Sequence, residues 1–509
     1  MGQQVLLPSP RLSSFCRVWA APCLAVVLIC VSGGTAAAQT GETPSAVVAR
    51  AWALLDRYLD KGSVWEQGVA VIALAGVGTP EAMVRVDRVA QSASPTRATA
   101  LRSLAWSGRA EYLPAIASAI ADPDRSVRIE AIAGLNAIRD PAVLPLLQHA
   151  LASDDSETVE RAGGAAGTLG ALAFPLMLDV LDTGNRHARA HVALALSARL
   201  DPSLRPDAAE SLDALRRLHP ERILRQTLQD SESWASTNAA LMLARLGDPA
   251  AVPVLRAVAA GSDRNGRYLA MGALNALGVA GYLSALVDLL HSADSDASAG
   301  AMRGLQSFPT ATVREVLLRA WLEPGPLAVR APAFAGLTAR VTPADERMLR
   351  AGLRDPETAI RITAARKLLS LFPSDTESVG ALEAVVLTDP VWPNLLVDEI
   401  ATAAPERGAA ILQRLWPESN EAAAKTFNGG GLSLIYVAGK LGDRQFIPKL
   451  EALLGAEQNV DEFVVNALLA LGGPDVAGIL VRAMDSPYSA ARIKTAAGVI
   501  RLYSGNSPH

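Results

Sequence analysis

The chain has 509 residues, half of them apolar and only 5% aromatic, and its formal net charge is −4. One hydrophobic core stops growing at roughly 250–300 residues, so this length requires several domains or a repeat array. The slight excess of acids excludes the clustered basic surface of most nucleic-acid-binding proteins, and we expect no nucleic-acid partner.

The first 38 residues have the features of a secretory signal peptide. Arg11 and Arg17 accompany an apolar run over 18–31 that is too short for an ordinary membrane span, and small residues with Ala-x-Ala spacing precede Gln39. We expect segment 1–38 to be removed, leaving a periplasmic or extracellular protein without a membrane span, and an uncleaved anchor stays open as the alternative. The mature chain then has no disulfide and no thiolate metal site, because the removed segment holds all three cysteines, Cys16, Cys23 and Cys30.

The rest of the chain repeats a helix-pair pattern. The clearest unit, residues 121–151, has an Asp-Pro turn, a helix that opens with Val-Arg, a turn of small residues and a second helix with paired leucines. Arg128, Ala131 and Leu135 define a frame triple, and we call the helix that carries such a triple a frame helix. The Ala and Leu share one helical face, and the small Ala lets neighbouring helices approach closely. The triple recurs from Gln67, Arg97, Arg189, Ser236, Arg267, Ser298, Arg330, Arg361 and Val464, and several intervals are 31 or 32 residues.

This unit resembles the HEAT/PBS-lyase-like repeat. The resemblance implies an all-α fold, a right-handed α–α superhelix of about 13 or 14 helix pairs. We expect one continuous HEAT-like solenoid over residues 44–505. A first helix over 46–59 and a half-repeat over 490–503 are expected to cap its two ends.

Six frame positions hold arginine. The resemblance implies that such an arginine reaches an aspartate in a turn of the same or the next repeat, which makes a structural ladder that fixes how the repeats stack. A line of arginines offered to an anionic ligand is the alternative, and nearby acids such as Asp122, Asp124 and Asp355 argue against it. The six ladder residues are Arg97, Arg128, Arg189, Arg267, Arg330 and Arg361.

The frame breaks at two places. Near 201–222 the interval between frame positions lengthens and three prolines interrupt it, which predicts an irregular insert with an extra short helix. Over 390–432 the repeats are broken, because Trp-Pro pairs interrupt them and Phe-Asn-Gly-Gly-Gly replaces the usual helix opening. A broken repeat presents groups that regular repeats do not, so this segment is the favoured location for a binding site.

Tryptophan is strongly enriched at binding hot spots, and it also fills cores. Trp234 begins a frame helix, and Trp392 and Trp416 are each followed by proline, so these three are the best placed for exposure. With Phe427 and Asn428 they are our predicted partner-binding residues. Packing in the core is the alternative for the tryptophans.

Catalytic chemistry has little support. His187 and His191 stand at i,i+4 spacing, which places two imidazoles on one helical face as metal ligands require. The motif lacks the glutamate of a zinc protease, and Arg186 and Arg189 add positive charge beside it. We therefore expect a solvated helix face, no metal and no cofactor. The glycine run 429–431 is a candidate anion-binding loop, and a plain turn is the simpler interpretation.

The HEAT-like class includes enzymes, and their signatures are missing here. Its di-iron hydroxylase uses His-Glu dipeptides, and this sequence contains none. Its bilin lyases are intracellular, and its DNA glycosylases need a basic groove. We therefore predict an exported, non-catalytic scaffold that binds a protein or peptide partner, with an envelope complex as one candidate. The alternative is a metal-binding or catalytic HEAT-repeat protein that uses His187 and His191 or the 390–432 segment.

Overall fold

The computed structural model describes residues 43–339, 341–388, 393–417, 432–455 and 460–504. Across these ranges the regular structure consists of helices, without a strand, which confirms the all-α, HEAT-like fold. None of the helices in these ranges is both long enough and apolar enough to cross a membrane. The predicted signal peptide, residues 1–38, lies outside the described residues.

The chain falls into two compact units. Unit 1 combines residues 1–79 with residues 412–509, and unit 2 consists of residues 80–411.

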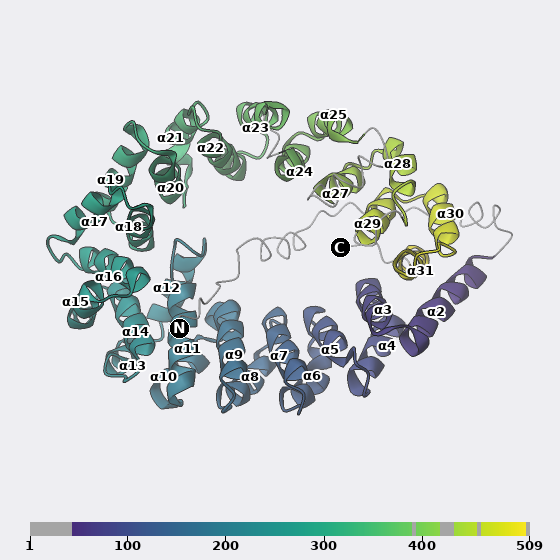
Figure 1. Ribbon diagram of the computed structural model, residues 1–509, viewed down its shortest axis with the longest axis horizontal. Coiled ribbons are helices and arrows are strands. Elements are labelled where there is room, and N and C mark those ends of the chain that lie inside the picture. Colours follow the sequence, from purple (N-terminus) through teal and green to yellow (C-terminus); the bar gives the residue numbers. More distant parts are fainter. Residues whose placement is uncertain (1–42, 340, 389–392, 418–431, 456–459, 505–509) are drawn as a thin grey trace. The chain divides into compact units, whose positions relative to one another are not determined.

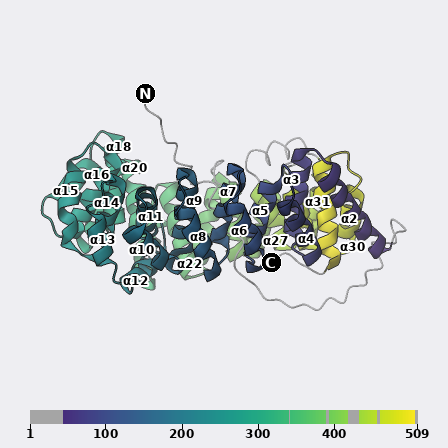
Figure 2. The ribbon, with the colours of Figure 1, turned by 90° about the horizontal axis from the view of Figure 1, so that it is seen from below.

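Unit 2 is built from two rows of helices (Figure 1, Figure 2). From α5 to α22, each frame helix packs against the next frame helix and against the second-row helix that precedes it. The frame row contains α5 (Arg97–Trp106), α7 (Arg125–Gly134), α9 (Ser156–Leu169), α11 (Arg186–Arg199), α14 (Ser233–Leu246), α16 (Arg264–Ala276), α18 (Ser295–Ser307), α20 (Leu327–Leu337), α22 (Thr358–Leu371) and α24 (Pro393–Ala403). Helices α9 and α24 carry no frame triple, and we call them frame helices because they lie in this row. The second row contains α4 (Pro80–Gln91), α6 (Leu113–Ile120), α8 (Leu144–Leu151), α10 (Phe174–Thr183), α13 (Glu221–Thr227), α15 (Val252–Ala260), α17 (Tyr282–Leu290), α19 (Ala311–Leu322), α21 (Glu346–Gly352), α23 (Thr376–Thr388) and α25 (Pro405–Leu415).

Short 3-10 helices form many of the connections between the α-helices. They are η2 (Ala110–Tyr112), η3 (Leu135–Ala137), η4 (Pro141–Val143), η5 (Gly170–Leu172), η6 (Pro249–Ala251), η7 (Pro343–Asp345) and η9 (Arg444–Phe446).

The frame triples form the core between the rows. Ala131 and Leu135 are completely buried, as are Ala270 and Leu274 four repeats later. Burying a leucine side chain stabilises a fold by about 1.5–3 kcal/mol, so the recurring leucines supply much of the drive for stacking. The small residues set the helix spacing as their position in the pattern predicts.

Glycine brings two of the frame helices especially close. A Cβ atom built on Gly272 of α16 would lie 2.2 Å from the backbone oxygen of Gly304 in α18, far inside van der Waals contact. Only glycine therefore permits this approach at position 272.

The predicted irregular insert near 201–222 contains an additional helix, α12 (Ala208–Arg216), ahead of α13. The loop before α12 is held by a nearly buried ion pair, in which Arg245 Nη2 lies 3.1 Å from Asp201 Oδ2. The Arg245 guanidinium also lies 4.5 Å from the centroid of the Phe308 ring. Arg245 thus anchors the start of the insert near the C-terminal ends of α14 and α18.

Unit 1 brings the two ends of the described chain together. It contains α2 (Pro44–Lys61), α3 (Val64–Val77), α27 (Leu432–Leu441), α28 (Ile447–Glu451), α29 (Asp461–Leu471), α30 (Pro474–Ala483) and α31 (Ser489–Ser504). Both α2 and α3 pack directly against α31 (Figure 1, Figure 2).

The two segments that we expected to cap the ends, over 46–59 and 490–503, pack against each other within unit 1. A cap needs a polar outer face, whereas α31 buries apolar residues toward α29 and α30 on one side and toward α2 and α3 on the other. Ile493, Val499 and Ile500 are all at most 2% exposed.

Candidate functional site

The arginine ladder positions the repeats, and four of the six predicted residues contact an aspartate of the following turn. Arg128 Nη2 lies 3.4 Å from Asp155 Oδ2, and Arg330 Nη2 lies 2.7 Å from Asp355 Oδ2. The other two ion pairs are Arg97 with Asp122 and Arg189 with Asp230.

In three of the four rungs, those of Asp122, Asp230 and Asp355, the aspartate uses one oxygen for its own turn and the other for the arginine. In Asp122 and Asp355, Oδ1 accepts the backbone N–H two residues later, at 2.8 and 2.9 Å, while Oδ2 faces the arginine. The same carboxylate therefore folds its own turn and joins it to the preceding repeat. This double use explains why aspartate, with its short side chain, occupies the position.

The remaining two ladder arginines bind their own turns. Arg267 donates to the backbone oxygen of Gly261, and Arg361 donates to the backbone oxygens of Asp355 and Pro356. These bonds fix the turn before the frame helix, and all six arginines are thus engaged with protein groups. Their geometry favours a structural ladder over a line of arginines presented to an anionic ligand.

The best-buried rung is a small polar cluster. Asp355 Oδ2 accepts from Arg330 at 2.7 Å and from the indole N–H of Trp321 at 2.9 Å. Arg330 Nε also donates to the backbone oxygen of Trp321, at 3.1 Å. The side chains of Arg330 and Asp355 are only 14% and 5% exposed. Removing either one would therefore leave a buried charge without its counter-charge.

Of the predicted partner-binding tryptophans, the structure exposes one and buries another. Trp234 is 61% exposed near the start of α14. Trp416 is only 7% exposed, with its ring 4.9 Å from that of Phe446, so its prediction as a binding residue is corrected. The proline after it ends the helix and leaves the indole in the core of unit 1. Trp392, Phe427 and Asn428 lie outside the described residues, as does the glycine run 429–431.

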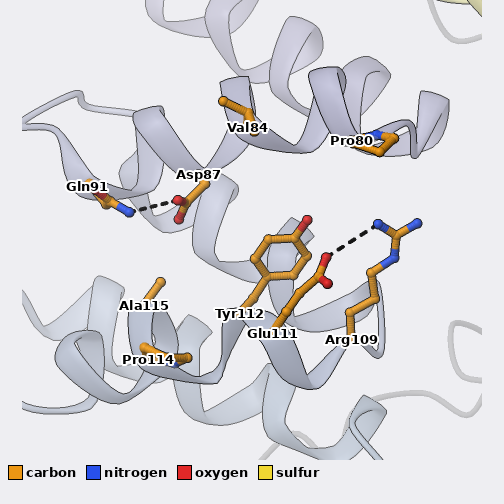
Figure 3. Close-up of a pocket in the computed structure, with 9 residues that line it drawn as sticks. All are labelled: Pro80, Val84, Asp87, Gln91, Arg109, Glu111, Tyr112, Pro114 and Ala115. Atoms are coloured by element: carbon orange, nitrogen blue, oxygen red, sulfur yellow. Dashed lines mark hydrogen bonds and ion pairs between the residues drawn. The ribbon is translucent and has the colours of Figure 1, made fainter.

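A groove of about 480 Å³ lies between α4 and the segment formed by η2 and α6 (Figure 3). Its apolar wall is made by Pro80, Val84, Pro114 and Ala115. Val84 is 66% exposed, so its side chain is accessible from solvent. The groove therefore combines concave shape with apolar surface that water covers at a cost.

Polar groups converge on the same groove from both sides. Asp87 points from α4 toward η2, while Glu111 and Tyr112 point from η2 toward α4 (Figure 3). Gln91 Nε2 donates to Asp87 Oδ2 at 2.7 Å, and Arg109 Nη1 lies 3.6 Å from Glu111 Oε1. These paired groups can exchange partners with an incoming ligand at small cost, because both pairs are exposed.

The Tyr112 phenol lies beside the carboxylate of Glu111 in the groove, and this changes its pKa. Partial burial raises the pKa of the Tyr112 phenol, and the hydrogen bond and charge of Glu111 raise it further, while Arg109 opposes them. The phenol consequently remains protonated at neutral pH and serves as a hydrogen-bond donor or acceptor.

A second hollow, of about 370 Å³, lies on the frame row between α7 and α9. Ile129 lines it together with Glu130 and with Arg125 and Glu157, which form an ion pair. Glu130 in turn binds Arg102 of α5, with Arg102 Nη1 3.2 Å from Glu130 Oε1.

This hollow continues into an exposed indole. Arg102 lies over the Trp106 ring, 5.5 Å from its centroid, and Trp106 is 59% exposed at the end of α5. Three consecutive frame helices thus share one amphipathic surface, which we call the α5–α9 face. Its charged side chains are already ordered by pairing with one another.

The two histidines of the metal alternative lie where the helical spacing placed them, on α11. His187 is exposed and His191 is half-buried. Burial lowers the pKa of His191, the charge of Glu160 opposes this and the charge of His187 adds to it. Within the described ranges, no group of three or more His, Cys, Asp or Glu side chains is arranged to hold a metal ion.

Trp106 and the groove residues were not singled out from the sequence. Trp106 stands nine residues after frame position Arg97, where the repeats before and after it hold Gly76 and Ala137. A large aromatic in place of a repeated small residue was the available signal. The groove had no such signal, because its residues come from second-row helices without a repeated motif.

The two rows of paired helices define a helical-repeat protein. Residues 84–166, which include every lining residue of the groove except Pro80, match the family model described as HEAT repeats. This segment therefore contains HEAT repeats, as the frame triples that begin at Arg97 and Arg128 indicate.

Known structures with similar repeats are distant from this chain. The complex of CpcE and CpcF of phycocyanin lyase from Nostoc sp. PCC7120 matches at 21% identity and a TM-score of 0.30, over 47% of this chain and 92% of that chain. Human deoxyhypusine hydroxylase matches at 21% identity and a TM-score of 0.22, over 54% of this chain and 98% of that chain. Kap95p, in a structure with RanGDP, matches at 12% identity and a TM-score of 0.35, over 89% of this chain and 72% of that chain. No curated protein matches the chain. At these scores, no activity or partner is carried over from any of them.

Proposed function

We propose that this protein is an exported, non-catalytic scaffold that binds an extended segment of a protein or peptide partner, with the α4–α6 groove as part of its binding surface. The groove is the observation that carries the proposal. Its volume of about 480 Å³ falls in the range of roughly 300–1,000 Å³ that is typical of ligand sites. Tyrosine and arginine line it beside apolar surface, and both are residue types enriched at binding hot spots.

The α5–α9 face supports an extended interface. Trp106 and Trp234 offer exposed indoles on the frame row, and an indole combines a large apolar area with a hydrogen-bond donor. Repeat proteins distribute binding over many units, so a partner in the groove can make further contacts along the second row, and the exposed indoles offer a separate surface on the frame row.

The test begins with a peptide library displayed on phage and selected against the purified chain 39–509. Selected peptides are then titrated against groove variants Val84→Asp and Tyr112→Ala by calorimetry. The matched control is Leu322→Asp, which changes an equally exposed apolar residue of unit 2 outside the groove.

We expect the groove variants to weaken binding at least tenfold, because hot-spot truncations cost about 2 kcal/mol or more, while the control binds normally. Selected peptides that bind all four proteins equally would remove the groove from the proposal. Peptides lost only with Trp106→Ala or Trp234→Ala would place the site on the frame row instead.

Export is tested separately, by expressing the full chain and sequencing the N-terminus of the product recovered outside the cytoplasm. The proposal expects that product to begin at Gln39. A full-length chain retained in the cytoplasm contradicts export without affecting the binding proposal.

A further inference from the structure

The last frame helix, α31, has no second helix after it in the described chain, yet it carries a complete frame arginine. Arg492 Nη1 donates to the backbone oxygen of Ser486, six residues earlier, at 2.6 Å. Arg128 and Arg361 make the same bond to the oxygens of Asp122 and Asp355, also six residues earlier, at 2.8 and 3.0 Å. Arg492 is therefore a ladder arginine by its geometry.

The other arm of Arg492 reaches the opposite end of the sequence. In the regular rungs this arm contacts the turn that precedes the next frame helix. In Arg492, Nε donates to Tyr58 Oη at 2.7 Å, and Tyr58 lies in the last turn of α2, just before frame helix α3. Tyr58 thus takes the place that aspartate holds in the other rungs.

Apolar packing follows the same pattern. Ala51 and Leu55 of α2 are completely buried, as is Ile493 of α31. α31 packs against α3 as one frame helix packs against the next, and against α2 as against a second-row helix. At the rim, Arg50 Nη1 lies 3.1 Å from Asp485 Oδ2 and joins α2 to the turn before α31.

We propose that the first and last helices form one composite repeat, in which α31 is the frame helix and α2 is its second helix. In structural order, residues 44–77 then follow residues 489–504. The pair α2–α3 acts as a strap that covers the apolar face of α31 and closes unit 1.

If α31 and α2 form one repeat, joining the two natural termini and opening the chain elsewhere should leave the fold intact. A circular permutant joins residue 509 to residue 39 through a flexible Gly/Ser linker and starts at Gly325, in the exposed loop between α19 and α20. We expect its helical circular dichroism and its thermal midpoint to equal those of the natural chain 39–509.

The control is the natural chain with a protease site inserted at Gly325, which shows whether a break there is tolerated. If the cleaved chain stays folded and the joined permutant does not, the composite repeat is wrong. If both fail, the permutant is rebuilt with its break in another exposed loop, and the point variants below decide.

The strap is tested in the natural chain by hydrogen exchange with mass spectrometry. Leu55→Ala removes buried contacts of α2, and we expect peptides of both α2 and α31 to exchange about 30-fold faster or more, while α7 is unchanged. Arg50→Glu should loosen the same two helices, and adding Asp485→Arg should restore them.

Arg264→Glu, at the exposed pair of Arg264 with Asp296 in unit 2, is the matched control and should leave α31 unchanged. An α31 whose exchange does not respond to Leu55→Ala overturns the proposal.

Discussion

Replacing Arg330 with methionine tests whether the ladder carries energy or only accompanies the packing. The variant keeps an apolar stem and removes the guanidinium, so the buried carboxylate of Asp355 loses its counter-charge. Removing one partner of a buried ion pair costs about 3–5 kcal/mol. The indole N–H of Trp321 and the backbone N–H of Glu357 still donate to Asp355, so we expect the low end of that range, about 3 kcal/mol.

The assay is hydrogen exchange of individual peptides, because repeat arrays open locally and a single unfolding midpoint would average the effect. About 3 kcal/mol corresponds to roughly a hundredfold faster exchange in α20 and α22, with α7 as an internal reference. Arg264→Met is the matched control, because the Arg264–Asp296 pair is 3.7 Å long and both side chains are well exposed. Equal exchange in the two variants would refute the view that the rung stabilises the stack.

Other positions give contrasts that are as direct. Gly272→Ala forces a Cβ against the backbone of Gly304, and we expect it to lower the free energy of unfolding, measured by urea denaturation, by about 1–3 kcal/mol. Gly164→Ala, in the frame helix α9 with open space around it, should be neutral or stabilising. Two equal effects would contradict the close approach of α16 and α18. Trp416→Ala should destabilise unit 1 by about 3–5 kcal/mol, while Trp234→Ala leaves the melting curve unchanged, and the reverse order would contradict their burial. Burial raises the pKa of Asp461, against the backbone hydrogen bond from Gly455 and the charge of Lys494, so this group contributes most to stability at acid pH and its contribution falls as pH rises through the folded-state pKa. Asp461→Asn should therefore be more stable than the parent at neutral pH by a margin that shrinks toward acid pH, and a margin independent of pH would show that ionisation is not the cause. Metal analysis of the purified chain should find no metal that depends on His187 and His191, and stoichiometric zinc lost in His187→Ala would reverse that expectation.

The sequence predicted what repeats and missed what does not. Ala131 and Leu135 recur at fixed intervals because each repeat solves the same packing problem, so the frame helices could be placed before the structure was known. The resemblance to HEAT-like repeats implied an aspartate partner for the frame arginines, and four of them, Arg97, Arg128, Arg189 and Arg330, have one. Arg267 and Arg361 show its limit, since an identical residue at the identical position binds its own turn instead.

The candidate site lies beyond what a repeat pattern encodes. Val84 and Tyr112 belong to different second-row elements, and neither residue type alone indicates a groove. Trp416 was misjudged because its exposure depends on Phe446, which comes from a later helix. The contact between Tyr58 and Arg492 spans 434 residues, and no local feature of either residue announces the other.

The joined ends of unit 1 have a consequence for the order of synthesis. Helices α2 and α3 leave the ribosome first, but α31, against which they pack, leaves last. At about 5–20 residues per second, the first helices wait on the order of half a minute to a minute and a half for that surface to exist. The sequence of unit 2 is complete once residue 411 has been made, so unit 2 can fold on its own contacts while unit 1 still lacks α31. The chain therefore finishes folding with the segment that was made first.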